Sequence, residues 1–267
     1  MNTPKEIANN YIAIGKGKVN MPVAKMFVLG ILAGMFIAVG GIASATAGAA
    51  LPGAAGKIVG ACLFPGGLTM VLLAGSELFT GNCLLVIPLL KKEITIAGML
   101  KNWIIVYLGN FVGSMLIAAI CVFGHQTDTF NVGTALISTA VAKTSISFGD
   151  AVLKGIACNF LVCIAVWISF AAKQVSSKII GLFFPIAMFV LCGFEHSVAN
   201  MFYISAGLFA KGNENYMLMA EAAQVDVSGL TWGSMFTANL LPVTIGNIIG
   251  GAILVGVAYW FVYLKDD

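Results

Sequence analysis

Gly193-Phe194-Glu195-His196-Ser197-Val198-Ala199-Asn200 is the stretch that decides the fold, because it repeats the plan of Gly75-Ser76-Glu77-Leu78-Phe79-Thr80-Gly81-Asn82. Glycine, glutamate and asparagine stand at the same offsets in both copies, and long apolar sequence flanks each copy. Glu77 and Glu195 are the only carboxylates deep within apolar sequence. Polar groups are costly in lipid, and there they mark a functional site by default. The two copies therefore predict a duplicated membrane unit with a polar centre.

Composition places the chain among integral membrane proteins. Of its 267 residues, 60% are apolar and 9% are charged, and the mean hydropathy is +0.98. A soluble domain carries roughly 25% charged residues. A helix needs about 20 apolar residues to cross a hydrocarbon core of roughly 30 Å. We therefore expect an all-α protein with six transmembrane segments, at about 26–50, 58–90, 102–123, 150–172, 178–210 and 232–264.

The second and fifth segments are too long for one straight crossing, and each holds a polar copy near its middle. We expect each to be two half-helices separated by a loop, which is tolerated at membrane depth only inside protein or beside a cavity. The third and sixth segments also match, because Asn102 and Asn110 recur as Asn239 and Asn247. Three segments per copy predict inverted repeats, about 26–123 and 150–264. Half-helix N-termini that meet at the centre would suit an anion.

Charge orients the chain. All 14 cationic residues are lysines. Ten of them would share one face of the membrane, whereas Lys57, Lys143, Lys154 and Lys211 would lie on the other. The positive-inside bias then places both termini in the cytoplasm. Residues 1–25 form a separate, mildly amphipathic segment that could lie on the cytoplasmic face or dock on a neighbouring subunit, followed by the membrane domain at 26–264. The net charge of +3 reflects this bias and does not indicate a nucleic-acid-binding surface.

Several strings resemble the formate/nitrite transporter family essentially from end to end: Ser76 to Thr80, Lys143-Thr144, Asn159 to Cys163, Gly193 to Met201 and Asn239 to Gly251. The resemblance implies an aquaporin-like subunit, a homopentamer with one pore per subunit, and passage of small monovalent anions such as formate, nitrite or hydrosulfide. It also places the chain in the bacterial cytoplasmic (inner) membrane as a multi-pass protein. The context of Asn247 looks closest to formate channels, so formate leads.

The same resemblance assigns roles to individual positions. His196 resembles the central pore histidine, Thr80 the hydroxyl on the opposite loop, and Lys143 the vestibule lysine that attracts anions. The remaining positions that the resemblance places along the pore are the apolar constriction residues Leu78 and Phe189, with Leu68 and Phe64 on the cytoplasmic side, the neighbouring Val162, and the polar partners Asn159 and Asn247.

Each polar residue also has a purely structural interpretation. His196 could be a packed histidine that satisfies loop carbonyls. Glu77 and Glu195 could form a structural polar pair, each accepting N–H bonds from the opposite loop and so holding the two breaks in register. Thr80 could cap the half-helix that follows it. The asparagine pairs could hold helices together rather than line a pore.

The remaining residues have similar alternatives. Leu78 and Phe189 could be plain core residues, Lys143 an ordinary loop lysine, and His125 a solvated loop residue. The cysteines show no metal-like spacing and are interpreted as small packing residues. We therefore expect neither a metal nor a cofactor. The six cysteines are Cys62, Cys83, Cys121, Cys158, Cys163 and Cys192.

Charge energetics suggest how such a pore would work. A small carboxylic acid has a pKa of roughly 4, so at neutral pH it is an anion that the bilayer rejects. An apolar constriction strips its water and favours the neutral acid, and His196 could pair with the anion or pass it a proton. Two other classes stay open. The first is a pore for neutral solutes such as water or polyols, although this sequence lacks the paired Asn-Pro-Ala loops that such channels use. The second is an intramembrane enzyme, although Ser197 lacks a recognisable triad context.

Overall fold

The computed structural model describes residues 1–266, and these residues form helices and connecting turns without a β-strand. The α-helices are α1 (Pro4–Asn20), α2 (Val23–Ala50), α3 (Gly53–Leu63), α4 (Pro65–Leu73), α5 (Phe79–Asn82), α6 (Val86–Leu90), α7 (Ile96–Phe123), α8 (Val132–Thr144), α9 (Phe148–Ala171), α10 (Val175–Leu191), α11 (Ser197–Ala210), α12 (Glu214–Ala222), α13 (Trp232–Ser234), α14 (Leu241–Ile248) and α15 (Ala258–Tyr263). Two 3₁₀-helices, η1 (Cys83–Leu85) and η2 (Thr129–Asn131), and two π-helices, η3 (Met235–Leu240) and η4 (Ile249–Val257), connect them.

The predicted interruptions are confirmed in both long segments. The second segment stops being helical after Leu73 and resumes at Phe79, and the fifth stops after Leu191 and resumes at Ser197. Each break begins at a glycine in the left-handed region, with φ of +78° at Gly75 and +70° at Gly193. Glycine adopts this conformation without steric cost. The glycine that recurs in the sequence is therefore the residue that lets the chain leave each helix and form the break.

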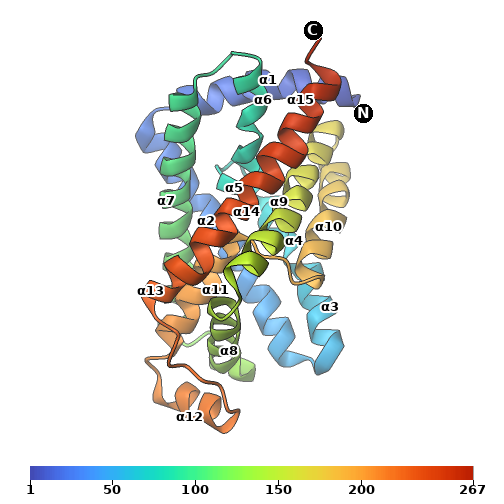
Figure 1. Ribbon diagram of the computed structural model, residues 1–267. Coiled ribbons are helices and arrows are strands. Elements are labelled where there is room, and N and C mark those ends of the chain that lie inside the picture. Colours follow the sequence, from blue (N-terminus) through green and yellow to red (C-terminus); the bar gives the residue numbers. More distant parts are fainter. Residues whose placement is uncertain (267) are drawn as a thin grey trace.

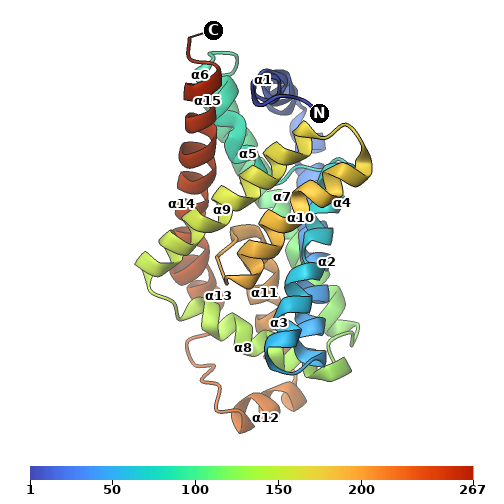
Figure 2. The ribbon, with the colours of Figure 1, turned by 90° about the vertical axis from the view of Figure 1, so that its right-hand side faces the viewer.

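The long helices run between the two ends of the molecule (Figure 1). Both chain termini lie at one end, and α12 lies at the other (Figures 1 and 2). Within each repeat the first and third segments cross closely at glycines. A Cβ on Gly30 would lie 3.2 Å from the Cα of Gly109, and a Cβ on Gly155 would lie 3.1 Å from the Cα of Gly246. Small residues permit such close packing of helices in membranes.

Helix α1 packs on its own chain and lies crosswise over the end that holds the termini (Figures 1 and 2). Ile7 and Tyr11 of this helix are buried on the side that faces the rest of the chain. The Tyr11 hydroxyl donates to the carbonyl of Gly81, at 3.3 Å, and the Asn2 amide N–H donates to the carbonyl of Ala171, at 2.8 Å. Part of the amphipathic pattern of this segment is therefore satisfied within the subunit. Helices α8 and α12 were not predicted from the sequence.

Candidate functional site

The two broken segments meet at His196 and Thr80. Thr80 Oγ1 lies 3.0 Å from Nε2 of His196, and both side chains are buried. His196 occupies the N-cap of α11, where its Nδ1 accepts the backbone N–H of Ala199 at 2.9 Å. A neutral imidazole carries one proton. Because Nδ1 is an acceptor, that proton sits on Nε2 and is donated to the Thr80 hydroxyl.

Thr80 does not cap its half-helix, as one interpretation of the sequence suggested. The N-cap position of α5 belongs to Leu78, and Thr80 lies inside the first turn. Its hydroxyl is therefore free of any capping bond and faces the imidazole. His196, by contrast, is a capping residue as well as the partner of Thr80.

Two matched asparagines anchor the breaks. The side chain of Asn247 accepts the N–H of Ser197 at 2.9 Å and donates to the carbonyls of Gly155, at 2.8 Å, and Glu195, at 3.0 Å. Asn110 makes the matching bonds to the Phe79 N–H, the Gly30 carbonyl and the Glu77 carbonyl, at 2.9, 2.8 and 2.9 Å. The hydrogen bonds of both side chains go to backbone groups. The asparagine pairs therefore act as connectors between helices.

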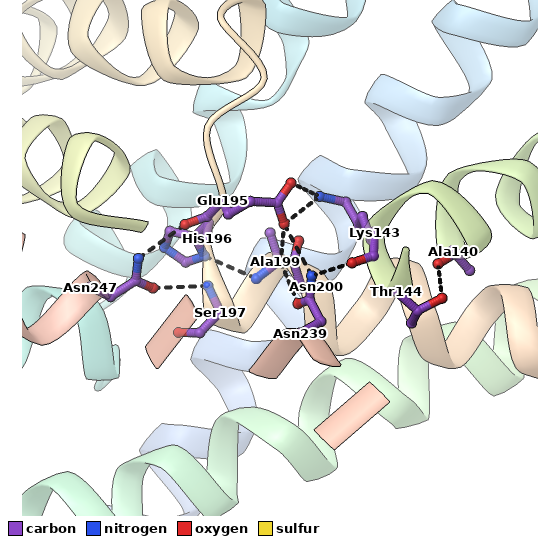
Figure 3. A network of polar contacts seen from close by, with 10 residues as sticks. All are labelled: Ala140, Lys143, Thr144, Glu195, His196, Ser197, Ala199, Asn200, Asn239 and Asn247. Atoms are coloured by element: carbon purple, nitrogen blue, oxygen red, sulfur yellow. Dashed lines mark hydrogen bonds and ion pairs between the residues drawn. The ribbon is translucent and has the colours of Figure 1, made fainter. Parts of the chain in front are cut away.

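Lys143 forms an ion pair with Glu195, as Figure 3 shows, with Nζ 3.0 and 3.1 Å from the two carboxylate oxygens. Asn200 Nδ2 donates to the same carboxylate at 2.5 Å and to the Asn239 side chain at 2.8 Å. Asn239 Nδ2 in turn donates to the Lys143 carbonyl at 2.8 Å. Lys143 is thus no ordinary loop lysine, because it lies in the last turn of α8 and its side chain is mostly buried.

The first repeat builds the same cluster with Lys18, a residue that the sequence analysis missed. Lys18 Nζ lies 2.7 Å from Glu77, and Asn82 Nδ2 donates to Glu77 at 2.7 Å and to Asn102 at 2.9 Å. A signal for Lys18 exists in the repeat. Lys18 stands five residues before α2 starts at Val23, as Lys143 stands five before α9 starts at Phe148.

The expectation that the glutamates accept N–H bonds from the opposite loop is wrong. Glu77 accepts from Lys18 and Asn82, and Glu195 accepts from Lys143, Asn200 and Asn239, so neither carboxylate reaches across. A buried carboxylate needs a paired cation and hydrogen-bond donors for its remaining lone pairs, and the lysine and asparagine side chains of its own repeat supply both. What joins the two breaks side chain to side chain is the contact between Thr80 and His196.

Cavities lie on both sides of this contact. A cavity of about 470 Å³ opens towards the end that carries α8, and its lining includes Ser44, Lys143, Glu195 and His196. A cavity of about 40 Å³ lies towards the chain termini, lined by Tyr11, Lys18, Leu68 and Leu78 among others. Only about 10 Å³ of space remains between them, where His196 meets apolar residues that include Phe64, Leu68, Leu78, Val162 and Phe189.

The sequence analysis expected Phe64 and Leu68 on the same, cytoplasmic side of this narrow passage. In the structure the two side chains lie on different sides of it. The rings of Phe64 and Phe189 meet edge to face with centroids 5.5 Å apart, and both line the large cavity. Leu68 lies towards the chain termini with Leu78. Phe64 precedes Pro65 at the junction of α3 and α4, one helical turn before Leu68. One turn of helix is enough to place the two side chains at different depths.

The other predicted residues lie as follows. Asn159 is fully buried and donates to the carbonyls of Thr80, at 3.1 Å, and Asn247, at 2.7 Å. His125 is exposed in its loop, 3.3 Å from Asp128. Four of the cysteines are buried, whereas Cys62 and Cys192 are exposed and so do not pack inside the subunit. Among residues 1–266, no group of three or more His, Cys, Asp or Glu side chains could hold a metal.

Comparison with known proteins agrees with this architecture. A sequence model described as formate/nitrite transporter matches residues 5–261. The chain is 40% identical to the "Uncharacterized transporter YrhG" of Bacillus subtilis (strain 168), over 99% of this chain and 94% of that protein. It is 38% identical to the "Formate channel FocA" of Escherichia coli (strain K12), over 91% of this chain and 88% of that protein.

A solved structure described as "Pentameric formate channel with formate bound" superimposes with a TM-score of 0.80. It is 33% identical in sequence, and the match covers 91% of this chain and 98% of that one. Sequence and fold thus agree over nearly the whole length. The chain belongs to the formate/nitrite transporter family.

Proposed function

We propose that this protein is a membrane channel for small monovalent anions, with formate as the leading substrate, and that passage depends on the protonation of groups around His196. The observation that carries the proposal is the contact of His196 Nε2 with Thr80 Oγ1 at 3.0 Å. It lies where two broken helices meet, beside a narrow apolar space of about 10 Å³. The relatives named as formate channels support formate.

The wide cavity collects the ion with a small net positive charge, because Lys57 lines it together with the paired Lys143 and Glu195. Lys143 is neutralised by Glu195 at 3.0 Å, so the ammonium offers its remaining donor capacity while the carboxylate does not repel the incoming anion. The N-terminal residues Ala199 and Asn200 of α11 line this cavity, and a helix N-terminus favours negative charge, although the N–H groups of Ser197 and Ala199 are already bonded to Asn247 and His196. An anion that enters the cavity therefore meets donors before it meets the apolar ring of Phe64, Phe189 and Leu78.

Protonation takes place at the narrow space. A bare anion stripped of water in an apolar surrounding is costly, and the neutral acid is much less so. The Thr80 hydroxyl accepts the Nε2 proton of His196, which leaves its own proton free to be donated to a carboxylate. A carboxylate that arrives there is therefore connected to the imidazole through one hydroxyl. A neutral imidazole cannot give up its only proton, so transfer to the anion requires that Nδ1 first take up a second proton, which displaces the bond from the Ala199 N–H. Import and export would then respond to pH through this proton uptake by His196.

Several further features belong to this proposal. The lysine bias supports cytoplasmic placement of both termini. The family resemblance supports the bacterial inner membrane, where lipid would surround the protein and protons would accompany the anion. The assembly is a homopentamer, as in the similar structure described as pentameric. The protein is not an enzyme. The Ser197 hydroxyl has no hydrogen-bond partner among the described residues, and His196 Nδ1 is already bonded to Ala199.

Flux into proteoliposomes tests the proposal. Formate, nitrite and hydrosulfide are compared at about pH 5.5 and about pH 7.5, values that bracket the ordinary titration of histidine, with the wild type and His196→Phe. We expect the highest flux for formate, with a pH dependence that His196→Phe abolishes. Higher flux of nitrite or hydrosulfide would reassign the substrate within the family. An unchanged pH dependence in the variant would remove His196 from the mechanism, and swelling in glycerol would indicate a neutral-solute pore.

A further inference from the structure

The backbone carbonyl of Thr80 has two side-chain donors on α9. Asn159 Nδ2 lies 3.1 Å from this oxygen, and Cys163 Sγ lies 3.3 Å from it. Asn159 and Cys163 are four residues apart, so they share one face of the helix. Both side chains are fully buried. Helix α9 belongs to the second repeat and α5 to the first, so these two bonds cross between the repeats.

The Thr80 carbonyl lies near the end of a short helix. Helix α5 contains four residues, and the 3₁₀-helix η1 follows at Cys83. A change from α to 3₁₀ bonding breaks the regular ladder, and the carbonyls of the last turn then require other partners. A buried carbonyl without a partner is strongly disfavoured. The neighbouring carbonyl of Phe79 likewise takes a thiol donor, Cys83 Sγ, at 3.6 Å.

The second repeat places a side-chain donor at the matched carbonyl with a different residue, although α11 is a regular helix of 14 residues. Val198 follows Ser197 in α11 as Thr80 follows Phe79 in α5, and the Val198 carbonyl accepts from Ser114 Oγ at 3.4 Å. Ser114 stands four residues after Asn110.

The residue that matches Ser114 in the second repeat is Gly251, four after Asn247. A Cβ on Gly251 would lie only 2.8 Å from Cys163 Sγ. In one repeat the donor therefore comes from the third segment, and in the other it comes from the first segment, with a glycine leaving room for it. Both repeats thus hold the carbonyl of the second residue of the half-helix from across the repeat boundary.

We propose that Cys163 is a positioning residue for transport. Its thiol, acting with Asn159, fixes the Thr80 carbonyl and thereby holds the Thr80 hydroxyl against Nε2 of His196. The thiol touches neither the narrow space nor either cavity, so it acts through Thr80 and not on the ion. This inference rests on the proposed function, because the quantity that it tunes is pH-dependent passage at His196.

The test compares Cys163→Ala with Cys163→Ser and with a matched control. Cys158→Ala is that control, because Cys158 lies on the same helix, is equally buried and donates no hydrogen bond to Thr80. Formate flux is measured in proteoliposomes over a series of pH values and formate concentrations. The S–H stretching band is recorded by infrared spectroscopy on the same proteins, since a hydrogen-bonded thiol absorbs at a lower frequency than a free one.

We expect Cys163→Ala to lower the maximal flux by about threefold to tenfold, the range that loss of one neutral hydrogen bond covers. The pH profile should shift, and the half-saturating formate concentration should not change, because the large cavity is intact. Cys163→Ser keeps a donor and should recover most of the flux. The infrared difference between the wild type and Cys163→Ala should show a hydrogen-bonded S–H band, whereas Cys158→Ala should leave that band and the flux profile in place.

Two results would overturn the inference alone: equal flux and pH profiles in the Cys163→Ala and Cys158→Ala variants, or an S–H band of Cys163 at the frequency of a free thiol. A wild-type flux that does not vary with pH and is unaffected by His196→Phe overturns the proposed function instead. The infrared band distinguishes the cases, because it reports the bond to Thr80 without any transport.

Discussion

The Thr80 hydroxyl and Nε2 of His196 lie 3.0 Å apart, although 116 residues separate them in the chain. The contact joins one half-helix from each repeat. His196 is fixed from behind, because its Nδ1 accepts the Ala199 N–H at 2.9 Å. The imidazole therefore presents one defined nitrogen to Thr80, and the hydroxyl is the group through which the ring meets its surroundings.

Thr80→Val should remove this contact with little change in shape. It leaves the Nε2–H of His196 buried without an acceptor, which costs about 1–3 kcal/mol. We expect formate flux to fall by about tenfold or more and its pH dependence to flatten, as measured in proteoliposomes. Thr80→Ser keeps the hydroxyl and should retain most of the flux. Equal activity of the valine and serine variants would contradict a role for the hydroxyl.

Glu195→Gln should destabilise the protein strongly, because it leaves the Lys143 ammonium buried without its counter-ion. The side chains of Lys143 and Glu195 are 16% and 7% exposed, so solvent screens the pair only weakly. Breaking a buried pair from one side costs about 3–5 kcal/mol, whereas neutralising both partners costs much less. The double variant Lys143→Met/Glu195→Gln should therefore unfold at a higher temperature than Glu195→Gln alone in detergent. An additive loss in the double variant would show that the pair is not coupled.

Gly40→Ala should separate α2 from the half-helix that carries Leu68. A Cβ on Gly40 would lie 2.9 Å from the Phe64 carbonyl oxygen, which is backbone and cannot rotate away. Overpacking of this kind costs about 1–3 kcal/mol. Gly48→Ala is the matched control on the same helix, because a Cβ there would meet nothing within 4 Å. Thermal unfolding should report a lower midpoint for Gly40→Ala, and an unchanged or higher one for Gly48→Ala.

The ion pair that ties α1 to the loop before α7 should respond to acid. Lys16 lies 2.7 Å from Glu93, and its hydrogen bond and charge lower the pKa of the Glu93 carboxyl. A lowered pKa in the folded state adds stability above the unfolded pKa, and this stability is lost as the pH falls through the folded value.

Lys16→Gln should therefore lower the unfolding temperature slightly at pH 7. The difference from the wild type should begin to shrink near the ordinary pKa of glutamate, about 4.3, and should vanish only once the pH has fallen through the lower pKa of Glu93 in the folded state. Lys101→Gln is the control, because Lys101 is exposed on α7 and forms no ion pair among the described residues. A difference that persists in acid would mean that Lys16 stabilises α1 in some way other than through Glu93.

The sequence was sufficient to predict the elements that repetition encodes. The broken segments follow from the glycine and glutamate copies. The equal spacing of Asn110 and Asn247 predicted matched roles but left a connecting role and a pore-lining role equally open, and only the structure shows the connecting bonds. The lysine partners of Glu77 and Glu195 were not predicted from the sequence. Lys18 and Lys143 lie outside the apolar segments, where a lysine is ordinarily solvated, and only the three-dimensional fold brings Lys18 to Glu77, 59 residues away.

The depth of a side chain along the passage could not be predicted from the sequence either. Phe64 and Leu68 are one turn apart, and the position of the narrow space between them depends on how α10 and α11 pack against α3 and α4. Thr80 was interpreted as a possible cap because its hydroxyl suits that role. The break ends two residues earlier than a cap at Thr80 would require, which leaves Leu78 as the N-cap.

The matched copies differ at one telling place, since Leu78 and His196 occupy equivalent offsets. Two identical half-length chains assembled about a twofold axis would carry the same side chain at both places, and hence two imidazoles or none. Fusion of the halves into a single polypeptide removes that constraint. It lets one face of the passage carry an apolar side chain while the other carries an imidazole, so ions arriving from opposite directions meet different surfaces in a different order.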